Sequence, residues 1–256
     1  MKAVILAGGY GTRIREVSES VPKPMIEIGG KPIIWHIMKN LSKQGVNEFV
    51  ICLGYRGSVI KSFFLDYAKN SNDIEIHTKN PDSFRITKQH SGEDWKVQLI
   101  ETGLDTPTGG RIFKARDYLK EERFLCTYGD GLADLDLNAL ISEHATKGKI
   151  ATVTAVSPPS RFGVLEIDNQ GGVKKFSEKD KVKEWVNGGF FILESEIFTF
   201  LDEDSVFERE PLEQLAIQGN LQAYVHNGFW KPMDTYREYI ELNSLWDKNL
   251  APWKNW

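Results

Sequence analysis

Short apolar runs alternate with amphipathic segments between residues 2 and 156 of the chain. The runs have the length of buried strands, and the segments between them repeat their apolar side chains with the period of a helix. Strands that alternate with helices in this way are typical of an α/β protein with a mainly parallel sheet. The predicted strands are Lys2 to Ala7, Glu48 to Leu53, Ile74 to His77, Lys96 to Glu101, Phe124 to Tyr128 and Lys149 to Val156.

Turn and capping residues mark the ends of several predicted helices. Pro32 suits the first turn of a helix that Gly45 stops, and Asp136 is a plausible N-cap of a helix that ends before Gly148. The predicted helices are Ile33 to Gln44, about Val59 to Lys69, Gly110 to Lys120 and about Leu137 to Lys147.

The pattern changes after residue 159, where short strand-like runs joined by glycine-containing turns could add antiparallel strands to the same sheet. These runs are Gly163 to Ile167, Val173 to Ser177 and Gly188 to Leu193. The last predicted elements are a helix near Pro211 to Gln218, a strand at Leu221 to Val225 and a helix from about Asp234 to Asp247. Because the sequence contains no repeat or long linker, we expect one compact domain over residues 1–256.

The composition is that of an ordinary globular protein and excludes several classes. Of 256 residues, 41% are hydrophobic and 27% are charged, which excludes a mainly disordered chain. Lys and Arg number 32 against 36 Asp and Glu, so the formal charge of −4 excludes a broadly basic nucleic-acid clamp. No apolar run approaches the roughly 18 to 20 residues of a membrane span. We therefore expect a soluble cytoplasmic protein in which Cys52 and Cys126 are small buried hydrophobes rather than a disulfide.

A glycine-rich loop directly follows the first predicted strand, in the run from Leu6 to Arg13. Its glycines let backbone N–H groups approach a polyphosphate, and Arg13 adds a fixed positive charge. A dinucleotide fingerprint would need another glycine at position 14, where Ile14 stands, and a Walker A loop would need Gly-Lys before Ser or Thr. The loop therefore predicts a different phosphate site, and a turn that only reverses the chain is the alternative.

Lys23 lies between Pro22 and Pro24 in the segment that follows. The two prolines are expected to hold the backbone of Lys23 extended and to limit the reach of its ammonium group. Such a restrained cation suits a phosphate ligand. A lysine that falls between two prolines in a solvated loop without any role is the alternative.

Two aspartates are candidate ligands of a hard cation. Asp130 follows the predicted strand Phe124 to Tyr128, at the edge where parallel α/β sheets bind ligands. Asp234 lies at the start of the last predicted helix and could converge with Asp130 on Mg²⁺, which typically takes one or two protein carboxylates. A helix N-cap is the alternative role of Asp234, while Asp134 and Asp136 are interpreted as turn and cap residues.

Several motifs resemble those of the sugar-1-phosphate nucleotidyltransferases. They are Leu6-Ala-Gly-Gly-Tyr-Gly-Thr-Arg13, Pro22-Lys-Pro-Met25, Gly29-Gly-Lys-Pro-Ile33, Thr108-Gly-Gly-Arg111, Tyr128-Gly-Asp-Gly131, Asn187-Gly-Gly-Phe-Phe191 and Phe229-Trp-Lys-Pro-Met-Asp-Thr235. The resemblance covers essentially the whole chain. It implies an α/β, Rossmann-like fold: a mainly parallel twisted sheet flanked by helices, with a small antiparallel sugar-binding portion in the second half.

The resemblance also implies an activity. The enzyme would transfer a cytidylyl group from CTP to α-D-glucose 1-phosphate with Mg²⁺ and release pyrophosphate, supplying a nucleotide sugar for surface polysaccharide. The half up to about residue 156 would bind the nucleotide, and the half from about residue 157 the sugar phosphate. A homo-oligomer without nucleic-acid or membrane partners is implied as well. No covalent nucleophile is needed, because cations and alignment bring the two anionic substrates together.

The same resemblance assigns roles to the candidate site residues. Arg13, Lys23 and Asp130 are catalytic, and Asp130 and Asp234 hold the metal. The nucleotide-binding residues are Leu6, Ala7, Gly8, Gly9, Tyr10, Gly11, Thr12, Arg13, Lys23, Thr102, Thr108, Gly109, Gly110, Arg111, Gly129 and Asp130. The sugar-phosphate-binding residues are Phe162, Gly163, Glu178, Lys179, Asn187 and Gly188.

The base and the sugar stay open at this point. A cytosine pocket must accept from an exocyclic amino group, and the sequence does not show that polarity, so a uridylyl- or thymidylyltransferase is an alternative. Relatives usually carry proline after the Glu-Lys pair, whereas Asp180 follows Lys179 here, which leaves the sugar open. A non-catalytic nucleotide-sugar sensor is a second alternative, although it would not need Arg13, Lys23, Asp130 and Asp234 together.

Overall fold

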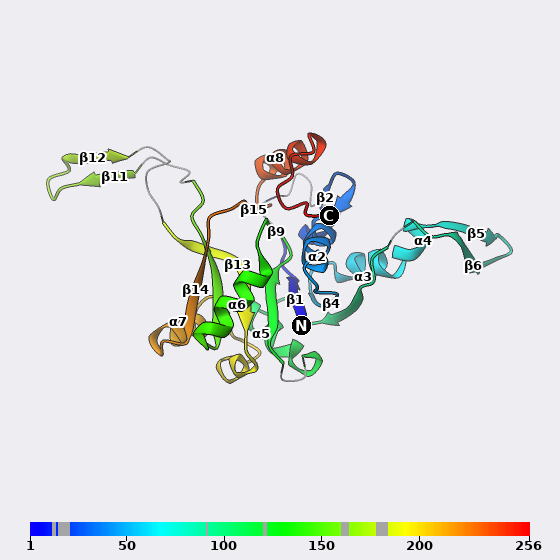
Figure 1. The fold of residues 1–256 in the computed structure, drawn as a ribbon, viewed down its shortest axis with the longest axis horizontal. Helices are drawn as coiled ribbons and strands as arrows, with labels where there is room; N and C mark the ends of the chain where they lie inside the picture. The colour runs from blue at the N-terminus through cyan, green and yellow to red at the C-terminus, as the bar shows by residue number, and fades with distance from the viewer. Residues whose placement is uncertain (12–13, 15–20, 91, 120–121, 160–163, 178–183) are drawn as a thin grey trace.

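The structure is a computed structural model that describes residues 1–11, 14, 21–90, 92–119, 122–159, 164–177 and 184–256. Seven strands form a central sheet in the order β14-β10-β13-β8-β1-β4-β7 (Figure 1). β13 runs antiparallel to both of its neighbours, and the other adjacent pairs are parallel. The strands are β1 (Lys2–Ala7), β4 (Glu48–Leu53), β7 (Lys96–Glu101), β8 (Phe124–Tyr128), β10 (Ala151–Val156), β13 (Val186–Leu193) and β14 (Leu221–His226).

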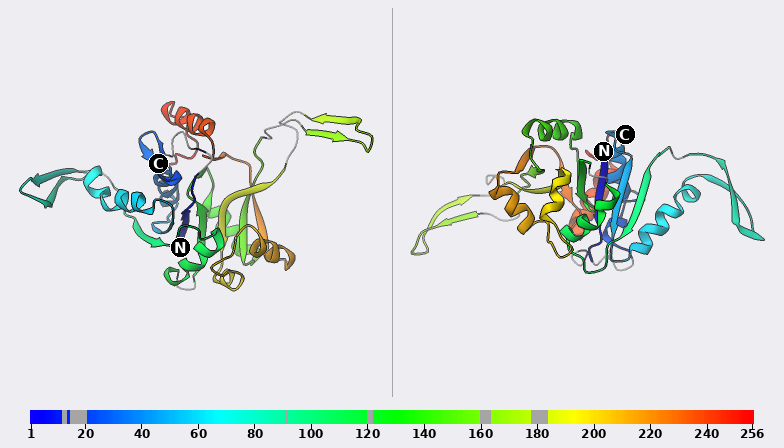
Figure 2. Two further views of the ribbon diagram at one scale, coloured as in Figure 1. Left: turned by 180° about the vertical axis from the view of Figure 1, so that it is seen from behind. Right: turned by 90° about the horizontal axis from the view of Figure 1, so that it is seen from below.

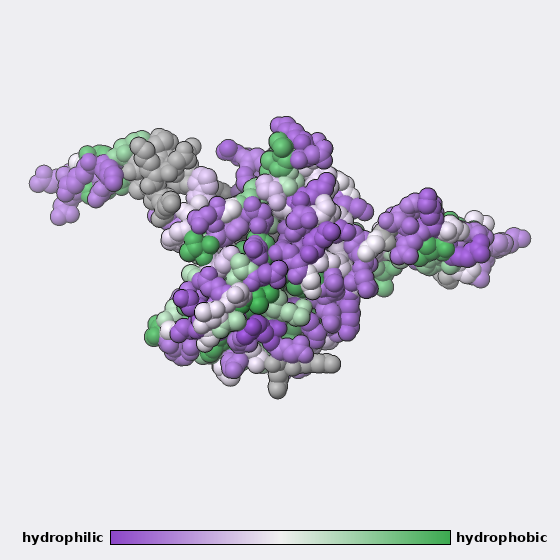
Figure 3. Space-filling model, in the orientation of Figure 1, coloured by the Kyte–Doolittle hydropathy of each residue, from purple (hydrophilic) through white to green (hydrophobic). Residues whose placement is uncertain are grey.

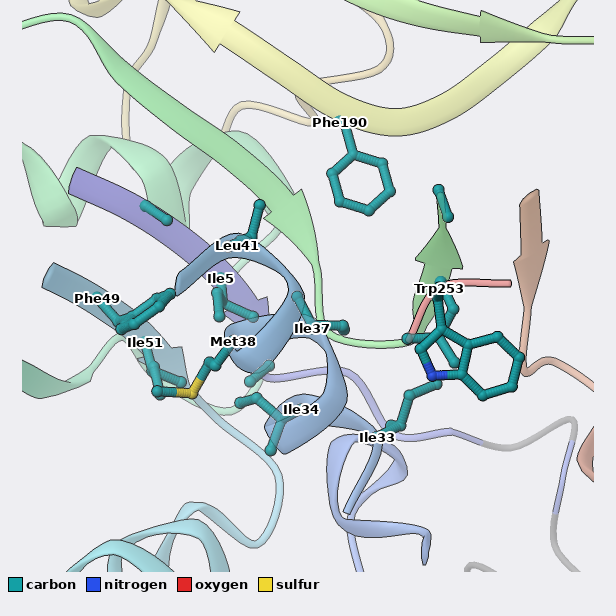
Figure 4. Close-up of a cluster of buried hydrophobic side chains, with 14 of the residues drawn as sticks. Ile5, Ile33, Ile34, Ile37, Met38, Leu41, Phe49, Ile51, Phe190 and Trp253 are labelled. Atoms are coloured by element: carbon teal, nitrogen blue, oxygen red, sulfur yellow. The ribbon is translucent and has the colours of Figure 1, made fainter. Parts of the chain in front are cut away.

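Helices cover both faces of this sheet. Alternate side chains of a strand point to opposite faces, so Val4 and Ile5 of β1 enter two separate apolar cores. Figure 4 shows the core around Ile5, where Ile37 and Trp253 also lie. The helices that supply this core are α2 (Ile33–Lys43), α6 (Leu137–Lys147) and α8 (Tyr236–Asp247), and those that supply the other are α5 (Thr108–Ala115) and α7 (Glu210–Ile217).

The predicted α/β class with a mainly parallel sheet is confirmed, and β1, β4, β7, β8 and α6 have the predicted bounds. Local chemistry explains why α6 is so well predicted. The Asp136 carboxylate accepts a hydrogen bond from Ala139 N at 3.0 Å, and Gly148 ends the helix in the left-handed region with a φ of 57°. The helix predicted to begin at Gly110 begins instead at Thr108.

Two hairpins extend away from the central sheet on opposite sides of the molecule (Figures 1 and 2). One pairs β5 (Asp73–His77) with β6 (Asn80–Lys88), and the other pairs β11 (Val164–Ile167) with β12 (Val173–Ser177). The expectation that β5, β11 and β12 join the central sheet is therefore wrong, and of the three runs predicted after residue 159 only β13 joins it as an antiparallel strand. The periodicity of a strand indicates which side chains share a face, but it does not identify the strand that pairs with it. The helices α3 (Gly57–Leu65) and α4 (Tyr67–Ser71) lead to the first hairpin.

The C-terminal tryptophans pack on α2. Trp253 is fully buried, and Asn40 donates a hydrogen bond to its carbonyl oxygen at 2.7 Å. The ring of His36 lies among those of Trp246, Trp253 and Trp256, with centroids 4.7, 6.2 and 6.2 Å away. Burial lowers the pKa of His36 to about 4, so at neutral pH this histidine is an uncharged part of the core.

Cys52 of β4 and Cys126 of β8 are buried free thiols, as expected. Burial raises the pKa of Cys52 to about 12, which makes its thiol unreactive at neutral pH.

Within the described ranges, no helix combines the length and the apolar character that crossing a membrane requires.

Candidate active site

A pocket of about 610 Å³ lies at the carboxyl ends of β1 and β8. Parallel α/β sheets bind ligands at this edge, because the loops that follow the strands converge there. The walls come from residues 6–11, from Lys23 and Pro24, from residues 104–108 with Arg111, and from residues 128–130. Among the predicted nucleotide-binding residues, Thr102, Gly109 and Gly110 lie behind the lining, and Thr12 and Arg13 lie outside the described residues.

The glycines of the loop after β1 have different surroundings. A Cβ atom on Gly8 would lie 2.2 Å from Cζ of Arg111, so only glycine leaves room for the guanidinium. Gly11 has a φ of +64°, and a Cβ atom there would lie 3.2 Å from Cβ of Lys23. Beside Gly9 the described part of the chain places no atom within 4 Å of the Cβ position. The loop therefore combines two closely packed glycines with one open position at the pocket.

Tyr10 links two walls of the pocket. Its hydroxyl donates a hydrogen bond to Asp105 Oδ1 at 2.6 Å, and its ring centroid lies 5.2 Å from that of Tyr55. The hydrogen bond to Asp105 raises the pKa of Tyr10, because it stabilises the protonated phenol. The glycine-rich loop is thus fastened to the wall of residues 104–108.

Arg111 is a buried cation in the pocket wall, with 4% of its surface exposed. Its guanidinium donates at 2.6 to 3.2 Å to the carbonyl oxygens of Gly8, Leu53, Gly103 and Leu104 and to Thr102 Oγ1. None of these acceptors is a carboxylate, and burial lowers the pKa of Arg111. The contacts fix the surrounding loops without cancelling the positive charge, which favours an anionic ligand in the pocket.

Gly109 and Gly110 allow a loop to pack closely on the start of α5. A Cβ atom on Gly109 would lie 2.6 Å from Ser205 O, and one on Gly110 would lie 2.1 Å from Glu203 O. Gly110 N also donates a hydrogen bond to Ser205 O at 3.0 Å. This backbone approach gives both glycines a packing role, separate from the nucleotide contact expected from the sequence.

Lys23 begins a 3₁₀ turn, η2 (Lys23–Met25), and the prediction of an extended backbone at this residue is wrong. A hydrogen bond from Met25 N to Pro22 O at 2.8 Å closes the turn. Pro24 then packs on Gly129, whose Cβ position lies 3.0 Å from Pro24 Cγ. This contact places the turn beside the loop that carries Asp130.

The ammonium group of Lys23 pairs with two carboxylates. Nζ lies 2.5 Å from Asp130 Oδ2 and also donates to Asp234 Oδ1. The side chains of Lys23, Asp130 and Asp234 are 11%, 27% and 20% exposed. Burial by itself would lower the pKa of Lys23, but the two carboxylates outweigh burial and raise it. The two acids are therefore close enough to share one cation.

Backbone pairing brings these two acids together. β9 (Gly131–Ala133) pairs in an antiparallel manner with β15 (Trp230–Pro232), and Met233 N donates to Asp130 O at 2.8 Å. Asp130 directly precedes β9, and Asp234 follows β15 by two positions. The short ladder therefore holds the acids next to one another, although they are far apart in the sequence.

The alternative role of Asp234 as a helix cap is wrong, because Thr235 caps α8. The Thr235 hydroxyl accepts from Glu238 N at 3.3 Å, and the Glu238 carboxylate accepts from Thr235 N at 2.9 Å. This reciprocal pair is a capping box. It satisfies the start of the helix and leaves the Asp234 carboxylate for Lys23.

The comparison with known protein families decides the class of this fold and site. Residues 2–249 match the family described as nucleotidyl transferase. The chain belongs to the nucleotidyl transferase family. The resemblance inferred from the sequence motifs is thus confirmed, and the protein is an enzyme of the nucleotidyltransferase class.

Relatives of this nucleotidyl transferase match it over its full length. It is 49% identical to glucose-1-phosphate cytidylyltransferase of Salmonella typhimurium over 260 residues, covering 100% of both chains. It is 47% identical over 258 residues to a Bacillus subtilis protein named probable glucose-1-phosphate cytidylyltransferase, again covering 100% of both. Among solved structures, HddC from Yersinia pseudotuberculosis is 27% identical, with a TM-score of 0.70 over 96% of this chain and 99% of that one.

The predicted sugar-phosphate residues of the nucleotidyl transferase fall into two groups. Phe162, Gly163, Glu178 and Lys179 lie outside the described residues. Asn187 is exposed near the pocket, with Nδ2 3.5 Å from the hydroxyl of Tyr128. The carbonyl oxygen of Gly188 accepts from Trp230 Nε1 at 2.7 Å, which ties β13 to β15. The described part of this site therefore adjoins the pocket at Tyr128.

Nucleotidyl transferases of this family typically use a divalent metal ion. Asp130 and Asp234 fit such an ion, because they come from different segments and already contact one common cation, Lys23 Nζ. Their partial exposure leaves room for water and phosphate oxygens, which usually complete the shell of Mg²⁺. The described residues include no cluster of three or more His, Cys, Asp or Glu suited to a metal, so this pair is the best-supported site among them.

The sequence motifs missed two acidic residues at the pocket of this transferase. Asp105 lines the pocket and receives the hydrogen bond from Tyr10. Glu208 accepts hydrogen bonds from Thr108 and Tyr128, two residues of the lining. Asp105 lies between Gly103 and Pro107, just before the Thr108-Gly-Gly-Arg111 motif, so its position was a signal that could have been used. Glu208 stands in no such motif, and only the tertiary structure brings it to the site.

Proposed function

We propose that this nucleotidyl transferase transfers a cytidylyl group from CTP to α-D-glucose 1-phosphate, giving CDP-glucose and pyrophosphate. The names of the two full-length relatives support these substrates. The observation that carries the chemical part of the proposal is the contact of Lys23 with Asp130 and Asp234 at one end of a pocket that opens beside a glycine-rich loop. This arrangement supplies cations and cation ligands where two mutually repelling anions must meet.

In the proposed reaction an oxygen of the sugar phosphate attacks the α-phosphorus of CTP. The bond from the α-phosphorus to the bridging oxygen of the β-phosphate breaks, and pyrophosphate leaves with that bonding electron pair. Lys23 neutralises charge at the reacting phosphorus, and Arg13 with the amides of residues 8–11 holds the β- and γ-phosphates. Asp130 and Asp234 would hold Mg²⁺, which when bound supplies further charge neutralisation. Alignment of the reactants can lower the barrier by about 7 to 11 kcal/mol.

The remaining assignments belong to the same proposal. Residues 1–156 would form the nucleotide-binding half and residues 157–256 the sugar-phosphate half of one domain. The base would meet the wall of residues 104–108 and Arg111, and the sugar phosphate would meet Glu178, Lys179 and Asn187. The buried free cysteines are in keeping with a reducing cytoplasm as the site of action.

A pyrophosphate-release assay tests the proposed function. CTP, UTP, dTTP and ATP are each supplied with glucose 1-phosphate and Mg²⁺, and we expect CTP to give the highest kcat/KM. Addition of EDTA should abolish release, and excess Mg²⁺ should restore it. A preference for UTP or dTTP would contradict the base assignment. Tight nucleotide binding without release from any of the four would favour the sensor alternative.

We also propose that the enzyme is a homo-oligomer assembled through its hairpins. On β11 and β12 the apolar residues Leu165, Ile167, Val173 and Phe176 are 53 to 63% exposed, and Leu165 faces Phe176 across the strands. An isolated two-stranded hairpin is at best marginally stable in water, so we expect this apolar face to be buried against another protein surface. Figure 3 shows apolar residues on both hairpins, at opposite ends of the molecule, which suits contacts between copies of the same chain.

Light scattering coupled to size exclusion tests this assembly. The wild-type enzyme is expected to elute as an oligomer, and Leu165→Asp combined with Phe176→Asp should lower the molar mass by placing two charges on the apolar face. Glu166→Ala, on the same strand but with a side chain on the other face, is the matched control and should leave the mass unchanged. A monomeric wild-type enzyme would refute the proposal.

A further inference from the structure

Glu208 lies behind two hydroxyl groups that line the pocket. Its Oε2 accepts a hydrogen bond from Thr108 Oγ1 at 2.6 Å, and its Oε1 accepts from the hydroxyl of Tyr128. Thr108 is the first residue of α5, and Tyr128 is the last residue of β8. One carboxylate therefore connects two walls of the pocket.

The Glu208 carboxylate fixes the direction of both hydroxyl protons. A carboxylate accepts hydrogen bonds and cannot donate them, so the protons of Thr108 and Tyr128 must point towards Glu208. Burial, reinforced by the Glu208 carboxylate, raises the pKa of Tyr128, and the phenol keeps its proton at neutral pH. Neither hydroxyl then has a proton to offer to a ligand.

Both oxygens nevertheless keep the capacity to accept. Thr108 Oγ1 accepts from Phe207 N at 3.0 Å, which uses one of its two lone pairs. Among the residues that the structure describes, the Tyr128 oxygen accepts only the long contact of 3.5 Å from Asn187 Nδ2. Each hydroxyl oxygen can therefore accept a further hydrogen bond from a donor in the pocket that both residues line.

We propose that Glu208 determines base specificity by holding the Thr108 hydroxyl as a hydrogen-bond acceptor towards the base. This inference rests on the proposed function and extends it to the choice of base. Cytosine carries an amino donor where uracil and thymine carry a carbonyl acceptor. Acceptors in the wall satisfy the amino group, whereas a carbonyl facing them leaves polar groups unpaired. Thr108 is the hydroxyl for the base, because Tyr128 adjoins Asp130 on the reacting side.

Glu208→Gln tests the inference, because the amide has nearly the shape of the carboxylate but replaces one acceptor oxygen with a donor. One hydroxyl must then accept from the amide, and its proton can turn into the pocket. Isothermal titration calorimetry with CTP and with UTP, without sugar phosphate, gives the ratio of their Kd values. In Glu208→Gln the preference for CTP should fall about ten-fold or more, with weaker CTP binding and tighter UTP binding.

Two further variants secure the test. Thr108→Val removes the hydroxyl, so it should also lower the preference for CTP, and Glu208→Gln should then add little in that background. This variant carries the test alone if Glu208→Gln does not fold. Glu203→Gln is the matched control: its exposed carboxylate lies 3.7 Å from Lys114 Nζ, and the preference should not change.

The outcomes separate this inference from the proposed function. An unchanged ratio in both Glu208→Gln and Thr108→Val overturns the inference, while wild-type preference for CTP would still support the proposed function. If Glu208→Gln loses affinity for CTP and UTP equally, the inference is overturned as well. Glu208 would then only stabilise the pocket wall and would not select the base. A wild-type enzyme that binds UTP as tightly as CTP refutes both.

Discussion

Replacement of Asp130 by Asn is expected to lower kcat about 1,000-fold while the fold stays intact. Asp130 and Asp234 contact one common cation. An amide has no negative charge, so it cannot hold the divalent ion that would offset the negative charge of the phosphates. The neutral, nearly isosteric side chain disturbs packing little, because Asp130 is 27% exposed. Pyrophosphate release under saturating CTP and glucose 1-phosphate measures the loss, and circular dichroism checks the fold.

Asp134→Asn is the matched control for this experiment. Asp134 lies on the same stretch of chain, four residues after Asp130, and its carboxylate pairs with His226 Nε2 at 3.0 Å instead of facing the pocket. The same change of charge there should leave kcat within a few-fold of the wild type. If Asp130→Asn and Asp134→Asn have equal activity, Asp130 is not part of the reacting site.

Lys23→Ala is expected to reduce kcat about 100-fold and to weaken CTP binding much less. The turn η2 places the ammonium at the pocket beside the two acids, so it is positioned to stabilise charge that develops on the phosphates. An interaction that acts mainly in the transition state lowers kcat, whereas one that acts equally in the bound state changes only affinity. Steady-state kinetics combined with calorimetry of CTP binding separates the two.

Lys31→Ala is the control for the second experiment. Lys31 also precedes a proline, but its Nζ lies over the ring of Trp35 at 5.8 Å and outside the pocket lining. Its loss should leave kcat and CTP affinity close to the wild-type values. A variant of Lys23 whose only defect is in CTP binding would show that the lysine tethers the nucleotide and takes no part in the transition state.

The middle of the central sheet could be predicted from the sequence because strands such as β1, β4 and β8 are buried on both faces. Strands such as β1 and β4 are therefore continuous apolar runs with sharp ends. The hairpins could not be placed, since β5 leaves all its residues exposed and its partner β6 follows it directly along the chain. Pairing of this kind depends on local turns rather than on burial, and the hydrophobic pattern carries little information about it.

The candidate site could be predicted where the backbone requires a glycine or a proline, because these residue types are recognisable in the sequence. The glycines of the first loop and the prolines around Lys23 are examples, and all of them lie at the pocket or beside it. The role of Glu208 could not be predicted from the sequence, because its partners Thr108 and Tyr128 are 100 and 80 positions away along the chain. The use of Arg111 as a brace for carbonyl oxygens also depends on the tertiary structure, since the sequence gives only its charge.

The ladder of β9 and β15 has a consequence for how the enzyme can vary. Main-chain atoms set the spacing between the two acids, including the hydrogen bond from Met233 N to Asp130 O at 2.8 Å. The side chains of β15 are only half-buried and can therefore be exchanged for others that tolerate an extended conformation without separating the acids, whereas those of β9 are buried. Substitutions at such positions can therefore accumulate while the spacing of the two acids, on which turnover depends, stays the same.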